Sequence, residues 1–102
     1  MLPAYEALAI VDQLLASPEH LVVRCRRLLG LLRALQVDLD MDELQVFRAV
    51  DSEADRWPLG VDCALLDAAY WHRSQSEMQD YAREVWDAVR AGCRVVRPLL
   101  AV

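Results

Sequence analysis

Apolar residues recur every three or four positions along most of the chain, which is the spacing of a helix that buries one face. The clearest stripe lies near the carboxyl end and consists of Met78, Tyr81, Ala82, Val85, Val89, Gly92, Cys93 and Val96. A second stripe has alternating spacings of four and three residues and consists of Leu21, Cys25, Leu28, Leu32 and Leu35. This pattern predicts an all-α fold.

Capping and turn residues divide the pattern into four or five predicted helices. Ser17 followed by Pro18 is a helix start, because the hydroxyl accepts a free backbone N–H and proline needs no partner there. Asp40–Glu43 and Ser74–Glu77 match the capping box and predict two more starts. Trp57–Gly60 is predicted to be a turn. The predicted helices cover residues 3–16, 18–36, 40 to about 55, 62–73 and 74–97, the last ended by Pro98.

The length and the composition fit one domain. A chain of 102 residues can form one hydrophobic core but not two, and 56% of its residues are apolar. We therefore expect residues 1–102 to form a single-domain bundle of four or five helices.

Charge is distributed unevenly along the chain. The net charge is −5, and nine of the sixteen acidic residues lie between Asp38 and Asp67, a segment whose only positive residues are Arg48 and Arg56. Such a chain is not expected to bind nucleic acid, which requires a basic surface to displace phosphate counterions. A solvated acidic surface instead favours a basic protein partner. The densest positive cluster, Arg24–Arg27, lies either in solvent on a helix flank or against an acidic surface.

Three features indicate a cytoplasmic protein. Cys25, Cys63 and Cys93 are odd in number, far apart and set in apolar helical stretches, as expected for buried free thiols. The amino terminus has Glu6 and Asp12 where a secretory signal needs a basic start and an apolar run. No stretch free of charged residues exceeds six residues, whereas a membrane span needs about 20 apolar residues. We therefore expect no membrane association.

The two candidate metal-binding patterns lack residues that a metal site requires. Asp38–Asp42 resembles the start of a calcium loop, but the sixth position is Glu43 instead of glycine and the twelfth is Ala49 instead of glutamate. His20 and His72 have no other His or Cys three or four residues away, so they form no local zinc pair. We predict no bound metal.

The sequence also contains no complete catalytic motif. The chain has no lysine and only three scattered glycines, which argues against a phosphate-binding loop. Cys63 lies nine residues before His72, but its apolar neighbours disfavour the thiolate that a nucleophile requires. We predict no enzymatic activity and no cofactor.

The residues predicted to contact a partner are acidic and aromatic. Aromatic residues are enriched where protein interfaces gain most of their energy. Trp57 lies in the predicted turn between acidic residues, and Tyr70 and Trp71 cannot both point inward from one helix. The predicted contact residues are Asp51, Glu53, Asp55, Trp57 and Asp62, followed by Tyr70 and Trp71.

Two segments give the chain a family resemblance. Residues 4–11, Ala-Tyr-Glu-Ala-Leu-Ala-Ile-Val, precede a helix that starts with proline, and residues 65–71, Leu-Leu-Asp-Ala-Ala-Tyr-Trp, place an acid before an aromatic pair. From residue 4 to residue 73 the chain resembles a group of small bacterial immunity proteins, the cytosolic inhibitors that protect type VI secreting cells from an NAD(P)-degrading effector. The predicted fifth helix extends beyond that family's pattern, so an immunity protein against a related toxin fits equally.

The resemblance implies inhibition without catalysis: the chain would cover the basic active-site cleft of a cognate protein toxin. The acidic surface would then imitate a phosphate-bearing substrate and be captured quickly through electrostatic attraction. The alternative is a self-associating helical adaptor or structural protein, whose exposed apolar edges would close a homodimer.

Overall fold

The computed structural model describes residues 2–59 and 65–100. These residues form four α-helices and one short 3₁₀ helix, and none of them belongs to a strand. The elements are α1 (Leu2–Ala16), α2 (Leu21–Ala34), η1 (Asp42–Leu44), α3 (Gln45–Ala54) and α4 (Ala68–Leu100). The predicted all-α bundle is confirmed.

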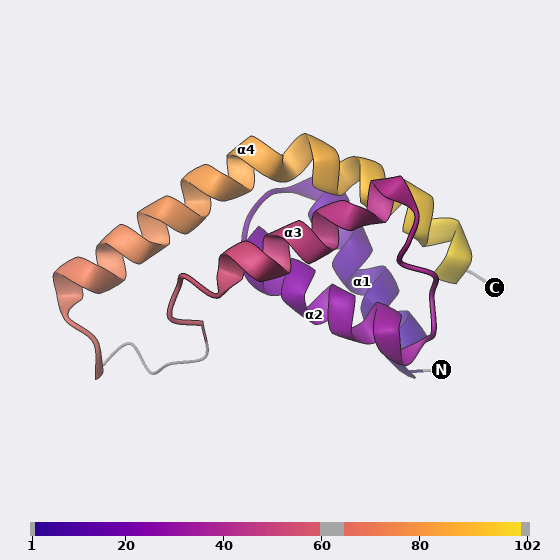
Figure 1. The fold of residues 1–102 in the computed structure, drawn as a ribbon, viewed down its shortest axis with the longest axis horizontal. Coiled ribbons are helices and arrows are strands. Elements are labelled where there is room, and N and C mark those ends of the chain that lie inside the picture. The colour runs from indigo at the N-terminus through magenta and orange to yellow at the C-terminus, as the bar shows by residue number, and fades with distance from the viewer. Residues whose placement is uncertain (1, 60–64, 101–102) are drawn as a thin grey trace.

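The long helix α4 organises the molecule. It has 33 residues and runs along the long dimension, while α1, α2 and α3 lie together beside its carboxyl-terminal part (Figure 1). Its first turns extend beyond the other three helices (Figure 1). Helix α2 packs against both α1 and α3, and α4 closes the bundle by packing against α1 and η1.

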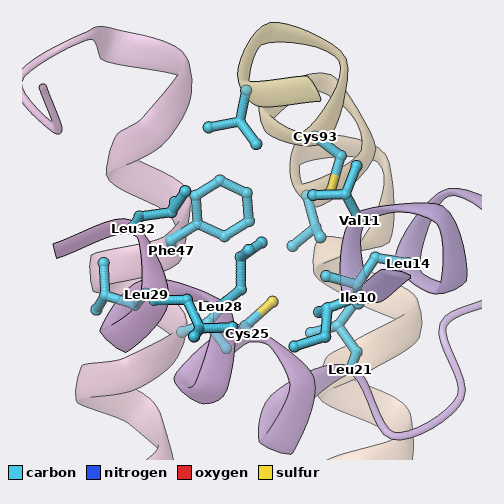
Figure 2. Close-up of a cluster of buried hydrophobic side chains, with 14 of the residues drawn as sticks. Ile10, Val11, Leu14, Leu21, Cys25, Leu28, Leu29, Leu32, Phe47 and Cys93 are labelled. Carbon is cyan, nitrogen blue, oxygen red and sulfur yellow. The ribbon is translucent and has the colours of Figure 1, made fainter. Parts of the chain in front are cut away.

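The hydrophobic core lies where the four helices meet. Figure 2 shows the ring of Phe47 from α3 among side chains of the other helices, and Phe47 is fully buried. Buried members of the two predicted stripes are Leu21, Cys25, Leu28 and Leu32 on α2 and Ala82, Val89, Gly92, Cys93 and Val96 on α4. The helical spacing of apolar residues therefore predicted the buried faces correctly.

Gly92 allows η1 and α3 to come close to α4. A Cβ atom at this position would lie 2.8 Å from the carbonyl oxygen of Glu43 and 3.0 Å from the ring of Phe47. Both distances are shorter than normal contacts, and the carbonyl oxygen belongs to the backbone and cannot rotate away. Any side chain at residue 92 would therefore push the two elements apart.

The prediction of separate fourth and fifth helices was wrong. From Ala68 onward both lie in one helix, α4, which passes through Ser74–Glu77 without a break, whereas residues 65–67 precede it. Glutamine and glutamate favour helices and serine disfavours them only weakly, so this segment can cap a helix or continue one. The helix continues through this segment because its inward face is continuous from Trp71 to Met78. Ser74 lies on that face and is only 3% exposed. The predicted start near Asp62 lies outside the described residues.

The start of α2 differs from the prediction by one turn. The helix begins at Leu21 rather than Pro18, and His20 before it has a φ of 55°, in the left-handed region. The hydroxyl of Ser17 does accept a backbone N–H, that of Glu19, at 3.1 Å. The serine therefore stabilises the turn that precedes the helix instead of the first turn of the helix.

Two further predicted helix boundaries are corrected. The capping box at Asp40–Glu43 does not form, because the backbone N–H of Asp40 donates to the carboxylate of Asp38 at 3.0 Å and the short helix η1 follows. Helix α4 continues past Pro98 to Leu100. Proline lacks the N–H and its ring crowds the carbonyl four residues earlier, but only Leu99 and Leu100 follow it in the described helix, so little of the helix depends on that position.

Candidate interaction surface

The predicted acidic contacts Asp51 and Glu53 of α3 and Asp55, the residue that follows α3, are paired with arginines of the same chain. Arg26 of α2 places Nε 2.8 Å from Asp51 Oδ1 and Nη2 2.7 Å from Asp55 Oδ1. Nη1 of Arg56 lies 2.8 Å from Oε2 of Glu53. Most of the charge of these three carboxylates is therefore balanced within the fold, and their contact with a partner stays a prediction.

The arginine cluster of α2 faces acids on both sides. Arg27 donates Nε and Nη2 to the two carboxylate oxygens of Glu6 on α1, at 2.8 and 2.9 Å. These hydrogen bonds hold the pKa of Glu6 below its ordinary value and raise the pKa of Arg27. The hydrogen bond to Asp51 likewise raises the pKa of Arg26. The cluster therefore lies on a solvated helix flank, where Arg26 and Arg27 remain 39% and 61% exposed while they pair with acids of the same chain.

Trp57 is part of the core edge and not an exposed aromatic residue. Only 6% of its surface is accessible. Its ring lies against Tyr81, with centroids 5.5 Å apart, and its indole N–H donates to Oε2 of Glu77 at 3.1 Å. The predicted turn is present in its described part, Trp57–Leu59, but it folds the indole inward toward α4. The expected exposure of Trp57 is therefore corrected.

The remaining predicted contacts lie at or before the start of α4. Tyr70 is 38% exposed and Trp71 is half-buried, which confirms that the two do not both point inward. Leu65, just before the helix, is 80% exposed. Asp62 lies outside the described residues, so its predicted contact stays a prediction. Tyr70 and Trp71 therefore lie in the first turn of α4, in the part that extends beyond α3 (Figure 1).

A second acidic surface, which sequence reasoning did not single out, lies on one flank of α4. It consists of Glu77, Asp80 and Glu84, and we call it the α4 acidic flank. These residues line a hollow of about 250 Å³ together with Arg56, Trp57 and Tyr81. Burial raises the pKa of Tyr81, and the nearby carboxylates of Glu53 and Glu84 raise it further.

Arginines balance only part of the α4 acidic flank. Arg83 pairs with Asp80, and Arg56 pairs with Glu53 at the rim. Within the part of the chain that the structure describes, Glu77 and Glu84 form no ion pair. The signal was visible in the sequence, because positions 77, 80 and 84 follow the spacing of one helix flank beside the apolar stripe.

The opposite flank of α4 borders an apolar groove. The groove has a volume of about 330 Å³ and lies between the α1–α2 connection, the first turn of α2 and residues 78–83 of α4. Val23 in its wall is 52% exposed. Three ionisable residues, Glu19, His20 and Arg83, also line the groove, but unlike the acids of the flank they do not share one sign of charge.

The two described cysteines are buried in the core. Burial raises the pKa of the Cys93 thiol to about 12, and it raises the pKa of Cys25 as well. Neither thiol is therefore prepared for nucleophilic chemistry at neutral pH. Cys63, the third predicted buried thiol, lies outside the described residues.

Comparison with protein-family models, curated protein sequences and solved structures gives no match for this chain. Among the described residues, no helix is both long enough and apolar enough to cross a membrane. The same residues contain no group of three or more His, Cys, Asp or Glu side chains placed to hold a metal ion.

Proposed function

We propose that the chain is an immunity or antitoxin-like inhibitor that binds a protein toxin through the α4 acidic flank. The observation that supports this most is the hollow beside Trp57 and Tyr81, which three carboxylates of α4, Glu77, Asp80 and Glu84, line together. A surface of this charge attracts a basic protein surface and speeds the encounter between the two. The proposed partner is a cognate toxin with a basic active-site cleft.

Inhibition in this proposal results from occlusion. Helix α4 is continuous from the acidic flank to its buried carboxyl-terminal half, so the acids stand on a rigid element anchored in the core. An arginine of the toxin would enter the hollow between Glu77 and Glu84 and gain charge-assisted hydrogen bonds there. The toxin's cleft would then be covered, and its substrate excluded.

The acids of α3 take a smaller part in this proposal. Glu53 pairs with Arg56, which lines the same hollow, whereas Asp51 and Asp55 are held by Arg26. Exposed ion pairs contribute only about 0–1 kcal/mol, so a partner's arginine can displace the chain's own at small cost. Tyr70 and Trp71 are proposed to add apolar contact at the end of the same helix.

A charge-matched pair of double variants tests the assigned surface. Glu77→Gln with Glu84→Gln removes two charges from the acidic flank, and the glutamine at residue 77 can still accept the N–H of Trp57. Asp42→Asn with Glu43→Gln removes the same charge from exposed residues of η1, beside the carboxyl-terminal part of α4. We expect only the first variant to slow association, by about threefold to tenfold at low salt, with a weaker salt dependence.

The measurement is stopped-flow association with the toxin domain encoded by the neighbouring reading frame, at low and high salt. Equal slowing in both variants would show that net charge alone matters and would contradict the assigned surface. A neighbouring frame that encodes no toxin would count against the proposed class.

A homodimeric adaptor is the second candidate, and the apolar surface near the start of α4 favours it. Leu65 and Tyr70 are exposed there. Sedimentation of the chain alone distinguishes the two candidates, because an adaptor of this kind forms a stable dimer. A monomer at all concentrations tested would exclude it.

A further inference from the structure

We draw no further inference here: the strongest candidate, the apolar groove between the α1–α2 connection and residues 78–83 of α4, carries none because nothing in the structure shows what covers it.

Discussion

Replacing Gly92 by alanine should destabilise the protein, although the same change at an open helix position stabilises. Alanine favours a helix over glycine by about 1 kcal/mol. At residue 92, however, the new Cβ would lie 2.8 Å from the Glu43 carbonyl oxygen and 3.0 Å from the Phe47 ring. Overpacking of a core costs about 1–3 kcal/mol. We therefore expect Gly92→Ala to lower the free energy of unfolding by up to about 2 kcal/mol.

Gly30 provides the matched control. It also lies inside a helix, α2, but nothing lies within 4 Å of a Cβ atom built on it. Gly30→Ala should therefore raise the free energy of unfolding by about 0.5–1 kcal/mol. Urea unfolding followed by circular dichroism measures both variants, and a difference of 1 kcal/mol corresponds to about 4–8 °C in melting temperature for a domain of this size.

If Gly92→Ala and Gly30→Ala change the free energy of unfolding in the same direction, the close contact of Gly92 with Glu43 and Phe47 is not supported. Equal stabilisation would mean that η1 and α3 do not approach α4 at residue 92 as closely as described. A loss of stability in Gly30→Ala as well would instead show that its position on α2 is not open.

Three further predictions concern Trp57, the Glu6–Arg27 pair and the cysteines. Trp57→Phe loses the hydrogen bond to Glu77 and should lower the free energy of unfolding, measured by urea titration, by about 1–2 kcal/mol. Tyr70→Phe removes only a hydroxyl at an exposed position and should change the free energy of unfolding little. Equal effects of the two variants would contradict the burial of Trp57. Arg27 lowers the pKa of Glu6, so this pair stabilises the fold above the ordinary value of 4.5 and the contribution is lost as the pH falls through the lowered pKa. Glu6→Gln should therefore weaken the dependence of the urea midpoint on pH in the acid range, and an unchanged dependence would argue against the pair. Cys25 and Cys93 should resist iodoacetamide in the folded chain and react after unfolding, as measured by intact mass; labelling of both in the native protein would contradict their burial.

The helical class and the buried faces could be predicted because they depend on local spacing. The stripes on α2 and α4 follow the turn of the helix, and the period reports directly which side is covered. The predicted boundary between two helices at Ser74–Glu77 was wrong because it was also inferred from a local pattern. A capping box is also local, but whether the helix stops there depends on what packs against Ser74, which the sequence does not state.

The candidate surface was less predictable because it depends on how helices face one another. Arg26 and Asp51 are 25 positions apart, and their pairing follows from the packing of α2 on α3. The inward position of Trp57 likewise requires Glu77 and Tyr81 of α4 as neighbours. The spacing of Glu77, Asp80 and Glu84 was available in the sequence, but only the hollow beside Trp57 distinguishes these acids from an ordinary solvated flank.

The hydrogen bond from the Trp86 indole to the carbonyl oxygen of Leu14 spans 72 positions at 2.8 Å. Contacts between α1 and α2 or between α2 and α3 join neighbouring segments and can form while the chain is still being made. Those between α1 and α4 form only after α4 has left the ribosome. Until then Val89, Cys93 and Val96 of α4 cannot fill the centre of the core, so the apolar faces of α1, α2 and α3 are covered last.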